Sequence, residues 1–357
     1  MRKFRVGIIG CGFIAEGKHM PALKQLRSVE MVAFCDKRIE RAEKARNEYA
    51  PEGVITSDYQ DLLSMDLDAV HVCTPNKSHA EISIAFMEAG KHVLCEKPMA
   101  ISTKEAKKMV EASKKNNRVL TIGYQNRFRA DSIHLKEICK SGGLGEIYLG
   151  KAHAVRRRAV PTWGVFLSEE EQGGGPLIDI GTHALDMTLW FMDNYEPLKV
   201  TGSVYKKLSQ TDNQGNAFGD WDPKEFTVED SAFAFVTMKN GATIVLESSW
   251  ALNTLDIGEA KSTLCGTKSG ADMNDGLRIN GVDFNRMYVN KPDLTKIDVA
   301  YTTNESDDAG YLESKAFYEC ILENKEPVVK PEEALVVTKI LEAIYESADT
   351  GKEIYFD

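Results

Sequence analysis

The 357-residue sequence has no run of about 18 consecutive apolar residues, the length that a membrane-spanning helix needs. Its first residues are basic, but the apolar stretch after them breaks at once into glycines, which makes a poor secretory-signal core. Its formal net charge is −10, from 44 Lys and Arg against 54 Asp and Glu. It therefore lacks the dense cationic surface that holds nucleic acid or an anionic membrane, and we expect neither as a partner.

Cysteine is also sparse, with seven scattered residues and no Cys-x-x-Cys pair. This odd number predicts neither a disulfide framework nor a zinc site, so we expect no bound metal and a reducing cytoplasm as the compartment. Hydrophobic residues make up 43% and charged residues 27%, the composition of a globular protein. At roughly 150 residues per domain, the length fits two domains better than three.

The first third of the sequence alternates short apolar runs with segments of helical composition. The runs cover residues 6–9, 31–35, 69–73, 92–95 and 119–122, and the helical segments cover 38–49, 78–89 and 103–116. Continuous apolar strands that alternate with amphipathic helices are typical of a parallel sheet covered on both faces. We predict an α/β fold with a doubly wound Rossmann domain over residues 1–124, whose ligands bind at the carboxyl ends of the strands.

The first strand runs into Gly10–Ala15, which reads GCGFIA. Gly10 permits a tight turn, Gly12 lets the backbone approach a pyrophosphate, and Phe13 and Ile14 open the following helix. Alone, this signal also fits an ordinary glycine-rich turn. The strand before it, the helix after it and an acid at the end of the next strand favour a dinucleotide loop.

That acid is Asp36, 24 residues after Gly12. A carboxylate there hydrogen-bonds the adenosine ribose and repels a 2′-phosphate, which favours NAD over NADP. Arg38 and the neighbouring cations Lys37 and Arg41 could accept that phosphate, so NADP stays an alternative.

Residues 125–357 show longer runs with alternating patterns, over 150–158, 199–208, 231–238, 242–250 and 262–265. Helical segments lie before, between and after them, and two close the chain at 311–323 and 331–349. We predict a C-terminal α/β domain with an open, mostly antiparallel sheet, and a polar loop over Tyr288–Ala309.

A glycine run, Gly173–Gly175, and a proline precede a largely apolar helical segment. At about 100° per residue, Asp179, His183 and Asp186 share one narrow stripe of this helix. Burying unpaired carboxylates costs several kcal/mol, so the stripe should face partners or a wet cleft. For Asp186, a satisfied structural network is an equal alternative.

Lys97 follows the strand over 92–95 and stands between Glu96 and Pro98. A nicotinamide would lie at this strand end if the glycine loop holds the pyrophosphate, and an ammonium there can polarise a substrate oxygen. A solvated surface lysine is the alternative, and the strand-end position favours the functional role.

Together these segments resemble the Gfo/Idh/MocA oxidoreductases. The resemblance rests on the loop at 10–15, on Cys73–Asn76 with His79, on Glu96–Pro98 and on the pattern over 174–186. It implies homo-dimers or homo-tetramers that oxidise a ring hydroxyl of a sugar, cyclitol or glycoside with NAD(P), with Lys97, Asp179 and His183 as the catalytic residues.

The resemblance also implies binding positions. Thr74, Asn76, His79 and Glu96 match residues around the cofactor, and Gln125, Arg156 and Arg158 match residues on the substrate side. The basic run 156–158 and the insert 160–172 depart from inositol dehydrogenases and put inositol in doubt. Within these departures, Trp163 either stacks on a pyranose or packs a loop. Arg156 and Arg158, on one strand face, either bind an anionic substrate or line a solvated edge.

We expect His183 to take the hydroxyl proton as hydride moves to the nicotinamide, Lys97 to stabilise the alkoxide and Asp179 to orient the substrate. Two other functions remain as alternatives. One is a redox-neutral enzyme that keeps NAD bound and cleaves glycosides through a 3-keto sugar. The other is a non-catalytic regulator that senses dinucleotide or sugar, which the presence of all three catalytic residues disfavours.

Overall fold

The computed structural model describes residues 2–211, 215–294 and 308–357. The chain folds into two compact units. Unit 1 comprises Met1–Phe128 and Ser306–Leu335, and unit 2 comprises Arg129–Glu305 and Val336–Asp357. Helix α9 (Pro331–Thr350) begins in unit 1 and continues into unit 2.

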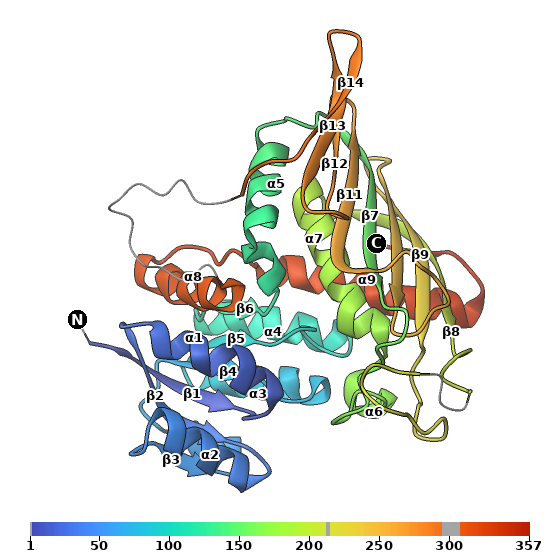
Figure 1. Ribbon diagram of the computed structural model, residues 1–357. Coiled ribbons are helices and arrows are strands. Elements are labelled where there is room, and N and C mark those ends of the chain that lie inside the picture. Colours follow the sequence, from blue (N-terminus) through green and yellow to red (C-terminus); the bar gives the residue numbers. More distant parts are fainter. Residues whose placement is uncertain (1, 212–214, 295–307) are drawn as a thin grey trace. The chain divides into compact units, whose positions relative to one another are not determined.

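Unit 1 contains a six-stranded sheet in the order β3-β2-β1-β4-β5-β6, with every pair of neighbouring strands parallel (Figure 1). The strands are β1 (Phe4–Ile9), β2 (Val29–Cys35), β3 (Val54–Thr56), β4 (Ala69–Val72), β5 (His92–Cys95) and β6 (Leu120–Ile122). The order reverses between β1 and β4, which is the switch point at which doubly wound sheets bind ligands. This confirms the predicted Rossmann sheet. Only β3 was missed, because three residues at a sheet edge are too short to show a pattern.

The helical elements of unit 1 are η1 (Ala15–His19), α1 (Met20–Gln25), α2 (Ile39–Tyr49), η2 (Tyr59–Leu62), η3 (Asn76–Ser78), α3 (His79–Glu88), α4 (Thr103–Asn116), η4 (Gln125–Phe128) and α8 (Ala309–Glu323). Helix α4 has the predicted bounds because both of its caps are legible in the sequence. The Ser102 hydroxyl accepts a hydrogen bond from the Glu105 N–H at 3.3 Å, and Asn117 ends the helix in the left-handed conformation.

Unit 2 contains a nine-stranded mixed sheet in the order β14-β13-β12-β11-β7-β10-β9-β8-β15 (Figure 1). Its strands are β7 (Ile147–Val155), β8 (Pro197–Tyr205), β9 (Ser231–Met238), β10 (Thr243–Ser249), β11 (Gly258–Gly266), β12 (Ser269–Asp272), β13 (Arg278–Asp283), β14 (Arg286–Asn290) and β15 (Ile354–Tyr355). Strands β7 and β10 run parallel and the other pairs antiparallel, which confirms the predicted open, mostly antiparallel sheet.

The remaining helices of unit 2 are α5 (Ala130–Lys140), α6 (Glu169–Gln172), η5 (Leu177–Gly181) and α7 (Thr182–Met192). Helix α7 packs closely on β7, because a Cβ at Gly150 would lie 2.7 Å from the Thr188 side chain. The strand predicted over 150–158 ends at Val155, so the basic run follows the strand instead of lying on it.

The predicted loop over Tyr288–Ala309 is wrong at both ends. Its first three residues belong to β14, and α8 begins at Ala309, while 295–307 lie outside the described residues. Strand β14 alternates too weakly to be recognised, because it is an edge strand with every side chain exposed.

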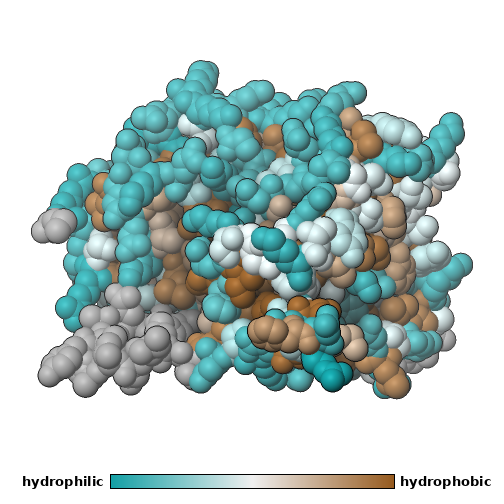
Figure 2. All heavy atoms as spheres, turned by 90° about the horizontal axis from the view of Figure 1, so that it is seen from above, coloured by the Kyte–Doolittle hydropathy of each residue, from teal (hydrophilic) through white to brown (hydrophobic). Residues whose placement is uncertain are grey.

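Strands β13 and β14 form a hairpin that exposes large apolar side chains. Phe284, in the turn between the two strands, is 92% exposed, and Met287 on β14 is 90% exposed. Figure 2 views the molecule from the top of Figure 1. On this mostly hydrophilic face, hydrophobic side chains gather near the middle.

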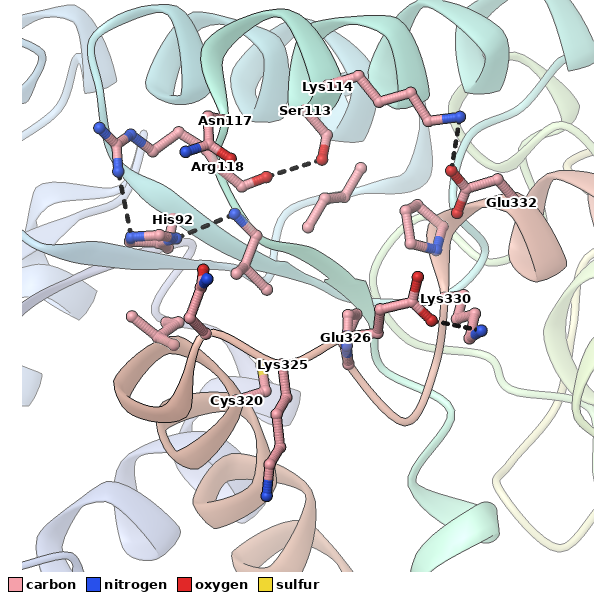
Figure 3. Close-up of a pocket in the computed structure, with 16 residues that line it drawn as sticks. His92, Ser113, Lys114, Asn117, Arg118, Cys320, Lys325, Glu326, Lys330 and Glu332 are labelled. Atoms are coloured by element: carbon pink, nitrogen blue, oxygen red, sulfur yellow. Dashed lines mark hydrogen bonds and ion pairs between the residues drawn. The ribbon is translucent and has the colours of Figure 1, made fainter.

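At the amino ends of β5 and β6, unit 1 has an open cavity of about 490 Å³ between α4, α8 and the segment that leads into α9 (Figure 3). His92 lines it and accepts a hydrogen bond at Nδ1 from the Val119 N–H at 2.9 Å, with the Arg118 guanidinium 3.4 Å from Nε2. Burial, and then the charge of Arg118, lower the pKa of His92 to about 4. This cavity is at the edge opposite the strand ends that carry the candidate cofactor residues.

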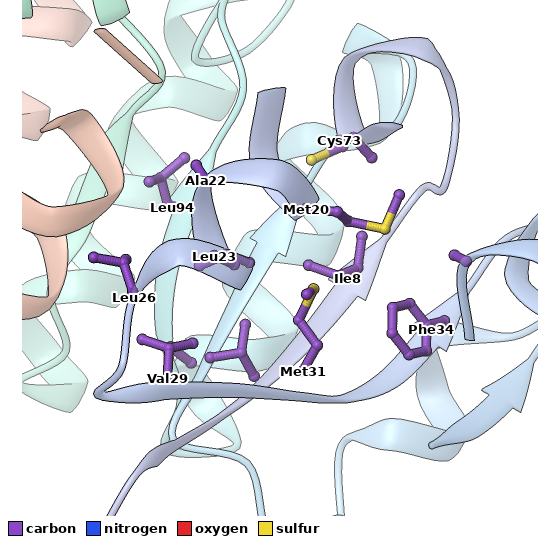
Figure 4. Close-up of a cluster of buried hydrophobic side chains, with 14 of the residues drawn as sticks. Ile8, Met20, Ala22, Leu23, Leu26, Val29, Met31, Phe34, Cys73 and Leu94 are labelled. Atoms are coloured by element: carbon purple, nitrogen blue, oxygen red, sulfur yellow. The ribbon is translucent and has the colours of Figure 1, made fainter. Parts of the chain in front are cut away.

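The hydrophobic core of unit 1 joins the sheet to helices from both ends of the chain. Its members include Ile8, Met31 and Phe34 from the strands, Met20 and Leu23 from α1, and Phe317 and Tyr318 from α8; the first five appear in Figure 4. All seven cysteines are free thiols. In the described part of the chain, no helix is both long and apolar enough to cross a membrane.

The low pKa of His92 predicts a loss of stability in acid. The unfolded chain binds a proton on this residue below its ordinary pKa of 6.5, whereas the folded chain does so only near 4. Its contribution is therefore present above pH 6.5 and is lost as the pH falls toward 4. We expect His92→Asn, which keeps an acceptor for Val119, to give a shallower acid slope of the unfolding free energy, so that the total loss between pH 6.5 and about 4 is smaller by ~2 kcal/mol or less, given the partial exposure of the ring.

Urea unfolding at a series of pH values measures this slope. His134, which is exposed on α5, provides the matched control His134→Asn. Equal slopes for His92→Asn and the wild type would refute the assignment.

Candidate active site

The loop after β1 has the geometry that a dinucleotide requires. Gly10 has φ +88°, and a Cβ on it would lie 2.6 Å from the Cys73 carbonyl oxygen, so only glycine fits between β1 and β4. At Gly12 the nearest atom to an added Cβ is Nη1 of Arg41, at 3.5 Å, which leaves the backbone open to a close ligand. Ala15 is fully buried in the position where the helix packs on the sheet. Phe13, in contrast, is 78% exposed.

Asp36, at the end of β2, is fixed beside this loop by two backbone donors. Its Oδ2 accepts a hydrogen bond from the Cys11 N–H at 2.9 Å, and its Oδ1 accepts one from the Arg38 N–H at 2.8 Å. The side chains of Lys37 and Arg38 are exposed. An oriented carboxylate next to an open glycine loop fits the ribose of NAD.

The loops after β4 and β5 are tied together by His79, which is fully buried. Its Nε2 lies 2.8 Å from the Thr74 carbonyl oxygen and its Nδ1 2.8 Å from that of Pro98. Burial lowers the pKa of His79, although both carbonyls act in the opposite direction. A neutral ring donates to only one carbonyl. Asn76 begins η3 beside Thr74.

Glu96 follows β5 and is 4% exposed. Its Oε1 contacts the Lys18 ammonium and lies 2.8 Å from Nε2 of His19, and its Oε2 accepts a hydrogen bond from the Lys97 N–H at 3.1 Å. Burial opposes ionisation, but Lys18 and His19 lower the pKa of Glu96 well below its ordinary value. Glu96 is therefore a buried anion that holds the backbone of Lys97, whose side chain is half-buried.

In unit 2, η5 and α7 form one continuous helical segment that carries the predicted polar stripe. Asp179 is half-buried and accepts a hydrogen bond from Nε1 of Trp250 at 3.0 Å. His183 is 8% exposed and Asp186 1%. The segment packs closely on β10, because a Cβ at Gly181 would lie 2.9 Å from the Ser248 hydroxyl.

Glu229 holds the start of this helical segment and had no signal in the sequence. It is 2% exposed, and its carboxylate accepts hydrogen bonds from the Gly175 N–H at 2.9 Å, the Leu177 N–H at 3.1 Å and the Tyr345 hydroxyl at 2.9 Å. A carboxylate at a helix N-terminus satisfies donors that have no partner within the helix. Its distance of more than 50 residues from Gly175 explains why the sequence does not reveal it.

The predicted substrate-side residues occupy different surroundings. Gln125 lies in η4 of unit 1, and its Oε1 is buried with no hydrogen-bond partner among the described residues. Arg156 in unit 2 pairs with both carboxylate oxygens of Glu259, at 2.6 and 2.8 Å. Arg158 donates to the Asn253 side chain at 2.7 Å. The charge of Arg156 is thus already matched within the protein.

Trp163 belongs to a group of rings in unit 2, which we call the aromatic cluster: Trp163, Phe166, Phe218 and Trp250. The Trp163 ring lies edge-on to Phe218 with centroids 4.9 Å apart and to Phe166 at 5.8 Å, and Phe166 lies 6.3 Å from Trp250. Trp163 is 41% exposed and Phe218 46%, whereas Trp250 is fully buried. The cluster therefore extends from the partner of Asp179 to the surface.

A doubly wound sheet with an open glycine loop, a fixed carboxylate after β2 and a lysine after β5 defines unit 1 as the dinucleotide-binding part of an NAD-dependent oxidoreductase. The chain belongs to the Gfo/Idh/MocA family. Residues 4–124 match its oxidoreductase domain with an NAD-binding Rossmann fold, and residues 136–356 match its C-terminal alpha/beta domain. This confirms the predicted family, fold and cofactor.

Among relatives, the D-glucoside 3-dehydrogenase of Escherichia coli is 33% identical over 351 residues, covering 98% of this chain and 97% of the relative. The myo-inositol 2-dehydrogenase of Thermotoga maritima is 28% identical, covering 69% of this chain and 68% of the relative. A solved aldose-aldose oxidoreductase from Caulobacter crescentus, complexed with glycerol, has a TM-score of 0.79 at 25% identity, covering 99% of this chain and all of that one. The chain is accordingly an NAD-dependent oxidoreductase of the sugar and cyclitol dehydrogenase type, as predicted.

The position of Asp36 predicts cofactor preference. We expect Asp36→Ala to weaken NAD binding by about tenfold or more, the effect of losing a hydrogen bond to a charged group, while NADP binding weakens less or improves. Titration calorimetry with each dinucleotide measures both changes. Asp66→Ala removes a carboxylate that is 77% exposed in the same unit and is the control. Unchanged NAD affinity in Asp36→Ala would contradict the assignment.

Proposed function

We propose that this protein oxidises the hydroxyl at position 3 of a D-glucoside and transfers the hydride to NAD. The observation that carries the proposal is the half-buried Asp179, one helical turn from His183 and connected through Trp250 to a partly exposed aromatic cluster. The match to a D-glucoside 3-dehydrogenase over nearly the whole of both chains supports it. In this proposal, residues 1–124 bind the dinucleotide, and residues 125–357 bind the substrate and form the oligomer.

Bound NAD supplies the hydride acceptor, and this chain's residues hold and orient it. We assign the pyrophosphate to the loop with Gly10, Gly12, Phe13 and Ile14, and the adenosine ribose to Asp36 and Arg38. We assign the nicotinamide side to Thr74, Asn76, His79, Glu96 and Lys97. The open backbone at Gly12 and the fixed carboxylate of Asp36 support these assignments.

The proton chemistry belongs to His183, Asp179 and Lys97. The Nδ1 atom of His183 is buried, so we assign uptake of the hydroxyl proton to Nε2. The Trp250 N–H holds the Asp179 carboxylate, which orients the neighbouring hydroxyls of the sugar. The Lys97 ammonium stabilises negative charge that develops on the oxygen.

The aromatic cluster favours a glycoside over a free sugar. Trp163 and Phe218 meet edge to face, and their exposed surfaces offer an apolar wall of the kind that binds an aglycone or a second sugar ring. We assign Gln125, Arg156 and Arg158 to the polar side of the substrate. Because Glu259 neutralises Arg156, an uncharged glycoside fits better than an anionic one.

We propose that unit 2 forms a homo-dimer or homo-tetramer. The hairpin β13–β14 exposes several large apolar side chains, namely Val282, Phe284, Met287 and Val289, at 67% to 92%. Apolar side chains this exposed on a hairpin at the edge of a sheet favour burial against a second copy of the chain. We further propose the cytoplasm as the compartment, which the seven free thiols support.

The roles of Lys97 and His183 predict variants that bind NAD but do not turn over. We expect Lys97→Met and His183→Asn each to lower kcat by about 100-fold or more, the usual range for a lost acid–base or charge-stabilising group. Absorbance of NADH is followed with glucosides, free sugars and cyclitols, and NAD binding is measured in parallel. Turnover that survives either change would sink the assignment.

The same assay separates the alternatives. Cleavage of a glycoside without added NAD would support the redox-neutral enzyme. Binding of NAD and sugar with no reaction on any substrate would support the regulator.

The aromatic cluster predicts selectivity for the group attached to the sugar. We expect Trp163→Ala to lower kcat/KM by about tenfold for glucosides with a large aglycone and to leave methyl glucoside nearly unaffected, the effect of losing one apolar contact. Tyr355→Ala, which removes an aromatic ring that is 63% exposed on β15, is the control. An equal loss for both kinds of substrate would instead indicate loop packing.

A further inference from the structure

Unit 1 buries a polar network of which the proposed function uses only Glu96. It draws Lys18 and His19 from η1, His71 from β4, Glu96 after β5, and Glu313 and Tyr318 from α8. The side chains of all six are nearly or fully buried. Residues almost 300 positions apart thus meet behind the strand end that carries Lys97.

One arm of the network has a single consistent arrangement of protons. His19 Nε2 donates to the Glu96 carboxylate at 2.8 Å, so the neutral His19 ring accepts at Nδ1 from Nδ1 of His71, also at 2.8 Å. His71 then accepts at Nε2 from the Tyr318 hydroxyl at 2.8 Å. Burial lowers the pKa of both histidines and keeps them neutral. This arm has no vacant position for another proton.

The other arm, in which Lys18 joins Glu96 to Glu313, has one vacant position for a proton. The Lys18 ammonium contacts both Glu96 Oε1 and Glu313 Oε2, the latter at 3.0 Å, so two carboxylates share one cation. Both oxygens of Glu96 accept hydrogen bonds from protein donors. Oε1 of Glu313 is buried and has no hydrogen-bond partner among the described residues. A proton that enters this cluster therefore binds at Glu313 Oε1.

The charges around Glu313 agree with this position. Burial, together with the charges of Glu96 and Asp308, raises the pKa of Glu313 to about 7, and Lys18 opposes the shift. Asp308 caps α8, so within the part of the chain that the structure describes, Lys18, Glu96 and Asp308 are the charged groups that face Glu313 from η1, the end of β5 and the cap of its own helix. Glu96, with two cationic or polar donors on one oxygen, stays ionised.

We propose that Glu313 is a positioning residue for the cofactor pocket. By gaining or losing one proton at Oε1, it sets how strongly Lys18 holds Glu96, and Glu96 in turn holds the Lys97 backbone. Ionised Glu313 competes with Glu96 for the ammonium, and protonated Glu313 leaves the ammonium to Glu96. The space for movement is small, because a Cβ at Gly123 would already lie 3.0 Å from Glu96 Oε1. The inference rests on the proposed role of Glu96 and Lys97 in NAD binding.

The test compares Glu313→Gln, which cannot ionise, with Glu319→Gln, a matched change on the exposed side of the same helix. NAD affinity is measured by calorimetry between about pH 6 and about pH 8, on either side of the ordinary neutral range. We expect the wild type and Glu319→Gln to bind NAD about threefold to tenfold more weakly at the high-pH end of this interval than at the low-pH end, as for a unit charge added near a coupled pair. Glu313→Gln should stay flat at the wild-type value of the low-pH end. Superimposable profiles for Glu313→Gln and the wild type would overturn the proposal.

Stability provides a second measurement. A raised folded pKa means that the native chain keeps a proton that the unfolded chain releases, so the contribution of Glu313 is present below pH 4.5 and is lost as the pH rises through about 7. Glu313→Gln should abolish this loss, and an unchanged stability profile would count against the proposal.

If Glu313→Gln does not fold, Lys18→Met replaces it. Removing the shared cation should weaken NAD binding at every pH, and unchanged binding would refute the proposal.

These readouts need no sugar substrate. A protein that shows the expected NAD profile but oxidises no glucoside would contradict the proposed substrate and leave the role of Glu313 standing. If the wild type oxidises glucosides but its NAD affinity does not change with pH, the proposed substrate stands and the role of Glu313 is refuted.

Discussion

The buried carboxylate of Glu96 is the constraint around which unit 1 is arranged. An ionised carboxylate away from water is stable only with several donors, and here η1 supplies an ammonium and an imidazole while the backbone of Lys97 supplies an N–H. Satisfying this one anion fixes the helix that follows the glycine loop, the strand end that carries Lys97, and, through His71 and Tyr318, helix α8. The geometry of the cofactor edge and the burial of α8 therefore have a common cause.

Unit 2 meets the same requirement with a different solution. Glu229 is buried against the first turn of the segment η5–α7, where backbone N–H groups without helical partners satisfy it in place of a cation. Tyr345 of α9 supplies the third hydrogen bond. A Cβ at Gly174 would lie 2.1 Å from the Tyr345 hydroxyl, so the glycine run is required by this contact. In both units, the segments that carry the proposed catalytic residues are held by a carboxylate that does not take part in the chemistry.

The sequence predicted the sheet of unit 1 well because its signals are local. The Ser102 cap of α4 acts on an N–H three residues away, the glycine at 10 and the acid at 36 stand directly after apolar runs, and periodicity shows the buried strands. The partners that orient the candidate site are not local. Trp250 reaches Asp179 across 71 residues, Glu229 reaches Gly175 across 54, and Glu313 reaches Lys18 across 295. Such partners have ordinary neighbours in the chain, so only the fold identifies them. The sequence did not reveal strand β14 for another reason, because an edge strand exposed on both faces has no apolar alternation to detect.

The position of α8 in unit 1 has a consequence for the order in which the protein is made. The sheet of unit 1 leaves the ribosome first, but the helix that covers part of its core and neutralises its buried polar groups begins only at Ala309. During most of synthesis, the cofactor-binding unit lacks Tyr318 and Glu313, and its inner apolar surface and the Glu96 cluster are incomplete. The first unit to emerge is thus among the last to be finished, and a nascent chain that stalls before α8 presents an unfinished nucleotide-binding fold to chaperones and proteases.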